Sequence, residues 1–139
     1  MNEIYNNIRR LSQLKMRGIA MEAVVILGKC PKSNQLYGMR TQKMSDGDWW
    51  RTWVFPIDEA RAKHEGYDQT QVMGHLYHTE EYRGCPYCGV KYFLQCSKCR
   101  KLSCYNGEKK ATCPWCGNKM DNLSWSSEPV VFTVTGGDI

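Results

Sequence analysis

The chain has 139 residues, of which 42% are hydrophobic and 24% charged, and its formal net charge is +5. These proportions are typical of globular proteins and exclude an intrinsically disordered chain. The longest apolar run, Ala23 to Leu27, is too short to cross a bilayer, and residues 1–15 lack the apolar core of a signal peptide. We therefore expect a cytoplasmic protein that does not enter membranes.

Residues 1–17 are expected to form an N-terminal amphipathic helix or arm. Ile4, Ile8 and Leu11 recur at helical spacing behind Asn2, which is a suitable N-cap. The apolar face of such a helix would dock either on the core or on a neighbouring protein.

The next region, residues 18–80, is expected to form an antiparallel β-meander with one short helix. Runs rich in β-branched and aromatic residues are separated by turn signals such as Ser45 to Asp48. Asp58 is a suitable N-cap for the helix, and Gly66 is a suitable residue to end it. The predicted strands are Met21–Leu27, Leu36–Met44 and Trp49–Phe55, and the predicted helix is Glu59–Glu65.

Side chains in the third predicted strand are expected to alternate between the two faces of the sheet. Strict alternation would place Trp49, Arg51, Trp53 and Phe55 on one face. We expect the tryptophans to pack in the core rather than to form a binding platform. Residues 67–84, which include His75 and His78, are expected to be a polar connector.

Residues 81–139 are expected to form a zinc-ribbon-like, metal-binding region that ends in a strand. The predicted strand covers Pro129–Val134, and Thr135–Asp138 are expected to fray. This half of the chain is too polar to build a hydrophobic interior, so metal–thiolate bonds would replace one. The expected fold class is a small β-rich, metal-stabilised fold, with residues 18–139 as one integrated unit.

Cysteines are concentrated in this region, since seven of the eight lie between Cys85 and Cys116. Clustered cysteines in a reducing compartment indicate metal ligands rather than disulfides. The segments 85–89 and 113–117 share the pattern C-P-x-C-G, which is typical of a zinc knuckle. Two knuckles can supply the four ligands of a tetrahedral site. The predicted first zinc site consists of Cys85, Cys88, Cys113 and Cys116.

The remaining cysteines predict a second zinc ion. Cys96, Cys99 and Cys104 supply three ligands, and a closed structural site needs a fourth. We favour Cys30, because it precedes a proline at the end of a predicted strand, as knuckle cysteines often do. His75 and His78 are the alternative fourth ligands.

Other chemistries fit these cysteines less well. A C-P-Y-C redox pair belongs in a βαβ unit, and a RING domain needs four ligand pairs rather than a single Cys104. A catalytic zinc needs an open coordination position, which four cysteines do not leave. We therefore expect no enzymatic activity.

A basic block raises the alternative of nucleic-acid binding. Residues 83–119 carry a charge of +7, and Lys91 to Lys119 would track phosphates while aromatic side chains stack on bases. A zinc ion with four thiolates carries −2, so two such sites would bring the net charge of the chain from +5 to about +1. For this reason we favour a non-catalytic protein-interaction module.

The run EYRGCPYCGVKYFLQCSKCRKLSCYNGEKKATCPWCG, from Glu81 to Gly117, resembles the TerY-C metal-binding domain. Upstream pieces agree with this resemblance: Gly-Lys-Cys-Pro at 28–31, Trp-x-Phe at 53–55, and the Ala…Glu-Gly helix end at 62–66. The resemblance covers approximately residues 20–138.

The resemblance implies a role in bacterial tellurite-resistance and stress-response systems. Such domains usually follow a von Willebrand factor A domain, and they are encoded beside a kinase-like protein and a protein phosphatase. The implied partners are these three kinds of protein, and the implied metal ligands are the eight cysteines. The Asp-x-Ser-x-Ser motif of a von Willebrand A domain is absent from this sequence. We therefore expect a free-standing version of the domain or a fragment.

Overall fold

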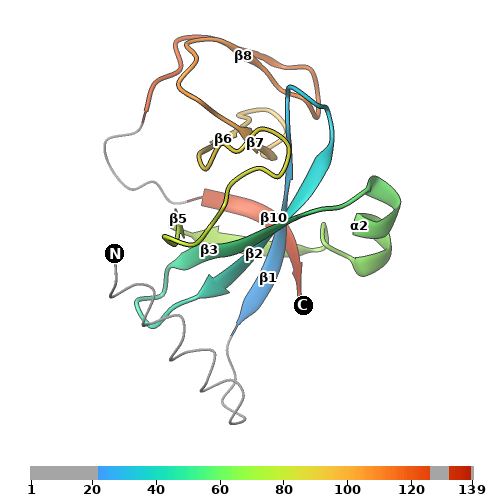
Figure 1. Cartoon of the computed structure of the whole chain (residues 1–139), viewed down its shortest axis with the longest axis vertical. Coiled ribbons are helices and arrows are strands. Elements are labelled where there is room, and N and C mark those ends of the chain that lie inside the picture. The colour runs from blue at the N-terminus through green and yellow to red at the C-terminus, as the bar shows by residue number, and fades with distance from the viewer. Residues whose placement is uncertain (1–21, 126–131, 139) are drawn as a thin grey trace.

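The computed structural model describes residues 22–125 and 132–138, which form ten strands and one short helix (Figure 1). The fold is β-rich and mostly antiparallel, as the sequence predicts. Within these residues, no helix has the length and hydropathy needed to span a membrane. The expected helix over residues 1–17 lies outside the described residues.

A three-stranded antiparallel meander forms the centre of the sheet and confirms the predicted one. Its strands are β1 (Ala23–Lys29), β2 (Leu36–Lys43) and β3 (Trp49–Pro56), and β2 pairs with both neighbours. The β2–β3 turn contains Gly47, whose φ of 88° favours glycine, and Asp46 Oδ1 accepts a bond from the Asp48 amide at 2.9 Å. Local turn chemistry therefore sets the register of this hairpin.

The predicted alternation in β3 is wrong beyond Arg51, because the strand contains a β-bulge. Arg40 pairs with Trp53 and Thr41 pairs with Arg51, so Thr52 is the extra residue. Because of the bulge, the side chains that follow it lie on the opposite face of the sheet from the one that strict alternation predicts. Val54 therefore joins Trp49 in the main core, whereas Trp53 is 50% exposed.

Both predicted irregular segments contain strands. The connector 67–84 forms β4 (Thr70–Gly74) and β5 (Leu76–His78), and the segment expected to fray belongs to β10 (Phe132–Asp138). Gly136 and Gly137 permit close backbone approach here rather than causing fraying. A Cβ atom at Gly137 would lie 2.5 Å from the Gly66 carbonyl oxygen, so only glycine fits.

The sheet closes on itself through the chain that links β4 to β5. The strand order is β4-β10-β1-β2-β3-β5, so these two strands occupy opposite ends of the sheet. Only His75 separates them in sequence, and its carbonyl oxygen accepts a bond from the Trp49 amide at 2.9 Å. The two ends of the sheet are thus continuous along the chain, as in a small barrel.

Helix α2 (Glu59–Glu65) forms where the sequence predicts it. Asp58 Oδ1 accepts a bond from the Arg61 amide at 2.7 Å, and Gly66 ends the helix with a φ of 74°. Ala62 packs with Leu36 and Ile57 in a small cluster outside the main core. The helix lies to one side of the sheet in Figure 1.

The cysteine-rich loops lie at one end of the sheet and carry four short strands (Figure 1). These strands are β6 (Phe93–Gln95), β7 (Leu102–Cys104), β8 (Ala111–Thr112) and β9 (Lys119–Met120). Strand β7 pairs in parallel with the end of β1, at Gly28 and Lys29. This pairing places Cys104 near Cys30, which follows β1 directly.

Candidate metal centres

The eight cysteines gather into two groups of four free thiols. Within each group, the four Sγ atoms all lie within 4.8 Å of one another. The first cluster contains Cys30, Cys85, Cys88 and Cys104, and the second contains Cys96, Cys99, Cys113 and Cys116.

This grouping corrects the one predicted from the sequence. The two C-P-x-C-G knuckles do not share a site, because Cys85 and Cys88 belong to the first cluster and Cys113 belongs to the second. Cys30 and Cys104 complete the first cluster rather than joining Cys96. The ligands of the two clusters therefore alternate along the chain. Cys96 and Cys99, of the second cluster, lie between Cys88 and Cys104 of the first, and Cys113 and Cys116 of the second follow Cys104.

Neither histidine considered as a ligand belongs to a cluster. His75 Nδ1 lies 2.9 Å from Asp48 Oδ1, and His78 Nδ1 lies 3.4 Å from Arg51 Nη2. Burial, Arg51 and Lys91 lower the pKa of His78 to about 4, so this imidazole is neutral at pH 7. Both rings therefore have structural partners away from the thiols.

Four turns of one geometry hold seven of the eight cysteines. In each turn the cysteine amide donates to the carbonyl five residues later, and the cysteine carbonyl accepts from the amide four residues later. The residue four positions after the first cysteine has a positive φ. This conformation costs a residue with a side chain about 1 kcal/mol. The turns begin at Cys30, Cys85, Cys96 and Cys113, and the positive-φ residues are Asn34, Gly89, Arg100 and Gly117.

Cys30 begins a turn of this kind that lacks a second cysteine. Its sequence is C-P-K-S-N, with Ser33 at the position where the other turns carry their second thiol. Asn34 replaces the glycine, and asparagine tolerates a positive φ better than most residues. Cys104, from β7, supplies the missing ligand. The match between C-P-K-S-N and C-P-x-C-G is the sequence signal that identifies this turn.

The sulfur positions fit a four-coordinate ion. A tetrahedron with metal–sulfur bonds of about 2.3 Å has edges of about 3.8 Å. In the second cluster, Cys96 and Cys116 Sγ are 3.7 Å apart, and Cys99 and Cys113 Sγ are 3.6 Å apart. Disulfide sulfurs would lie about 2.05 Å apart. The spacing therefore matches metal–thiolate coordination.

Backbone amides point at the first sulfur of three turns. Tyr87, Lys98 and Trp115 each place the amide nitrogen 3.4 Å from the sulfur two residues earlier. Such N–H groups stabilise negative charge on sulfur.

The thiols of each cluster differ in acidity. Burial raises the pKa of Cys30 and Cys96, but bonds from nearby amides and side chains outweigh it, and the pKa falls to about 7 for Cys30 and about 6 for Cys96. Burial raises the pKa of Cys99 to about 12 and also raises that of Cys104. A bound cation would offset this cost and hold all four thiolates ionised.

A buried arginine lies beside the first cluster. Arg51 is 2% exposed and lies between the rings of Tyr82 and Phe93, with its guanidinium carbon 4.8 and 4.6 Å from their centroids. Burial lowers the pKa of Arg51, and the opposing effects of Tyr82, Tyr37 and, to a smaller extent, Cys104 do not restore it. Among the described residues, no carboxylate oxygen lies within 4.0 Å of the guanidinium. We infer that the thiolates of the first cluster, once a metal is bound, supply its counter-charge.

The two clusters differ in exposure. Cys30, Cys85 and Cys104 are buried and belong to the main core, whereas Cys116 is exposed and Cys99 half-buried. Water and chelators reach the second cluster more easily.

We expect chelation to remove the two metal equivalents in separate phases. The second cluster should release its ion first, because its sulfurs are more accessible. Stopped-flow mixing with a chromogenic chelator measures this release. Cys116→Ser should eliminate the fast phase and keep the slow one, whereas release of both ions from the wild type in one phase would contradict the assignment.

A comparison with known families matches the model of the TerY-C metal binding domain to residues 20–138. The match covers nearly the whole chain and includes all eight cysteines. Searches of the curated proteins and of the solved structures found no match.

Proposed function

We propose, from the premise that this chain belongs to the TerY-C metal binding domain family, that it is a non-catalytic zinc-dependent interaction module. It would serve as a cytoplasmic adaptor in a bacterial stress-response or tellurite-resistance system linked to phosphorylation. The observation that carries this proposal is the use of four cysteines in each cluster. Four thiolates fill the coordination sphere of zinc, so a substrate has no position to occupy.

The positions of the clusters support a structural role for zinc. The first cluster joins the end of β1 to β7, and the second holds two turns of the cysteine-rich loops. Zinc is the metal that tetrahedral four-cysteine sites most commonly hold in proteins, although iron also fits sulfur ligands of this geometry.

Exposed aromatic side chains support an interaction role. Trp53, Tyr92 and Trp125 are each 50 to 52% exposed. Aromatic side chains are enriched in protein interfaces, where they supply much of the binding energy. The partners we propose are a kinase-like protein, a protein phosphatase and a von Willebrand A-type protein.

Binding to defined partners tests the adaptor proposal. The zinc-loaded chain would be titrated by calorimetry with each of the three purified proteins, taken from the same genome. We expect one of them to bind with one-to-one stoichiometry, and binding to disappear after zinc is removed. Failure of all three to bind the loaded chain would contradict the proposal.

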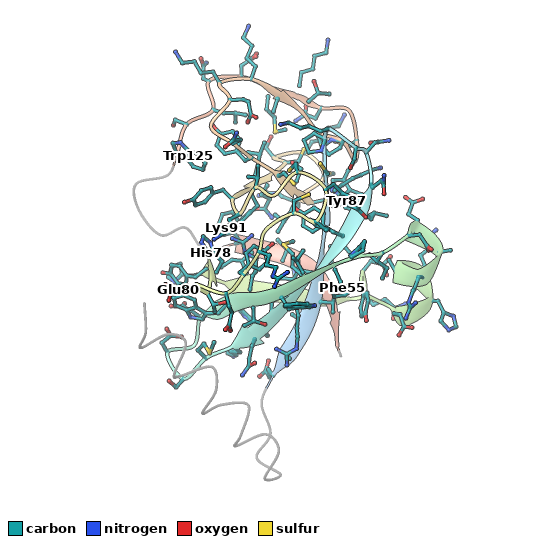
Figure 2. All side chains as sticks on the ribbon, viewed as in Figure 1. Phe55, His78, Glu80, Tyr87, Lys91 and Trp125 are labelled. Carbon is teal, nitrogen blue, oxygen red and sulfur yellow. The ribbon has the colours of Figure 1, made fainter. Side chains whose placement is uncertain are left out.

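Nucleic-acid binding is the second candidate, favoured by an exposed aromatic cluster beside basic residues. The Tyr92 ring packs against the rings of Trp125 and His78, with centroids 4.9 and 5.7 Å apart. Figure 2 shows Trp125, Lys91 and His78 along one side of the molecule, opposite Tyr87. Fluorescence anisotropy with a single-stranded oligonucleotide at low and moderate salt tests this candidate. Nucleic-acid binding would be favoured over the adaptor role if affinity fell steeply with salt and if Trp125→Ala weakened the binding further.

A further inference from the structure

A pocket opens where the partners of β1 diverge. One edge of β1 pairs with β10 at Val24–Ile26 and with β7 at Gly28–Lys29. Between these strands lies a pocket of about 90 Å³, which we call the fork pocket. Its apolar lining includes Ile26, Leu36, Ala62, Leu102, Trp115 and Val134.

The apolar lining of the fork pocket is fixed in place. The Trp115 indole N–H donates to the Leu102 carbonyl oxygen at 2.8 Å, which holds the ring against β7. Ala62 is presented by helix α2, and Leu36 begins β2. An apolar pocket of this size suits one aliphatic side chain of a partner.

Cations outnumber carboxylates on the rim of the fork pocket. Lys63, Arg100 and Lys101 line it together with two carboxylates, Glu59 and Asp68. Lys101 Nζ lies 4.5 Å from the centroid of the Trp115 ring, and Lys29 Nζ lies 5.4 Å from it. In the described part of the chain, no carboxylate oxygen lies within 4.0 Å of these four cations. The rim therefore carries an excess of positive charge that complements an acidic ligand.

Arg100 occupies a backbone position that favours glycine. Its φ is 65°, and the equivalent residues of the two C-P-x-C-G turns are Gly89 and Gly117. A large side chain at this position carries a steric cost that glycine avoids. Strain of this kind is concentrated at functional sites. The Arg100 side chain lines the fork pocket and also an adjoining hollow that Thr133 and Gln71 border.

We propose that the fork pocket binds an acidic segment of a protein partner, with one aliphatic side chain inserted and its carboxylates on Arg100 and Lys101. The inference rests on the proposed adaptor function and names the chemistry that the partner must present. The aliphatic lining favours a peptide over a nucleic acid. Nucleotide bases stack on open aromatic faces. The Trp115 ring is already in contact with the ammonium groups of Lys29 and Lys101, so it offers no such face.

A synthetic peptide tests the proposal directly. The probe is a fluorescein-labelled peptide of aspartates and glutamates around a single leucine, titrated with the zinc-loaded full chain. We expect saturable binding by anisotropy. Replacing the leucine by serine should weaken binding about tenfold, because the apolar contact is lost. A lysine-rich version of the peptide should not bind.

Arg100→Gly separates binding from folding. The variant should bind the peptide at least fivefold more weakly, and it should melt no lower than the wild type because glycine accepts this φ. Lys110→Gln removes the same charge at an exposed residue outside the pocket and should leave the affinity within twofold.

Three results would overturn the inference: no binding at low salt, equal affinity of Arg100→Gly and wild type, or equal affinity of the leucine and serine peptides. The last result would indicate nonspecific attraction between charges, as would full displacement of the peptide by an oligonucleotide. If a proposed partner binds Arg100→Gly as tightly as wild type, this inference fails and the adaptor proposal stands. If the peptide binds as expected and no proposed partner binds, the adaptor proposal fails and the fork pocket remains a site for acidic peptides.

Discussion

Cys30→Ser should abolish cooperative folding of the sheet, whereas the second cluster, whose four ligands lie in the cysteine-rich loops, should keep its metal ion. Cys30 is fully buried, belongs to the main core and follows β1, the strand that pairs with β2, β10 and β7. A structural zinc ion contributes roughly 10 kcal/mol or more of apparent binding free energy, comparable with the whole stability of a small domain. Thermal denaturation followed by circular dichroism measures the loss.

Cys116→Ser is the matched control for this prediction. Cys116 is an exposed ligand of the second cluster, which contacts Met120 and Ala111 rather than the main core. We expect hydrogen exchange to accelerate at β8 and β9 while the amides of β1 and β2 remain protected. Our account would be contradicted if Cys30→Ser melted within a few degrees of the wild type and kept two metal equivalents.

Arg51→Met should destabilise the protein by about 2–4 kcal/mol, because the first cluster would lose its buried counter-charge. A four-thiolate zinc site carries −2, and the interior provides little solvent to offset it. Methionine fills similar space and keeps the contacts with Tyr82 and Phe93 partly intact. The decrease in stability should therefore reflect the lost positive charge more than a change in side-chain volume.

Metal affinity distinguishes this prediction from a simple packing defect. Zinc competition with a chelator should show weaker binding at the first cluster of Arg51→Met and unchanged binding at the second. Arg51→Lys keeps the charge and should lose less stability in urea denaturation. Equal or greater stability of Arg51→Met would show that the arginine is not the counter-charge, as when apolar residues replace a buried ion pair without loss.

Local sequence signals predict the local parts of this structure. The three strands of the meander, helix α2 and the cysteine turns each depend on residues a few positions apart. The apolar and turn patterns encode these elements directly. Asp58 and Gly66, for example, fix both ends of α2 with their own side chain and backbone.

Non-local packing determines what the sequence did not predict. The partners of Cys30 depend on the parallel pairing of β7 with β1, which brings Cys104 from 74 positions further along the chain. Both groupings of the knuckles satisfy tetrahedral coordination, so ligand spacing alone does not choose between them. In the same way, the Thr52 bulge and the close approach of Gly137 to Gly66 arise from strand pairing.

The metal content of two double variants tests the central claim most directly, namely that the ligands of two metal sites alternate along the chain. Elemental analysis would be done on protein purified without added chelator and then equilibrated with a weak competing one. We predict that Cys30→Ser/Cys85→Ser keeps one metal equivalent and that Cys85→Ser/Cys113→Ser keeps none, because only the second pair spans both clusters. The opposite result, loss of both ions from the first variant and of one from the second, would contradict the account.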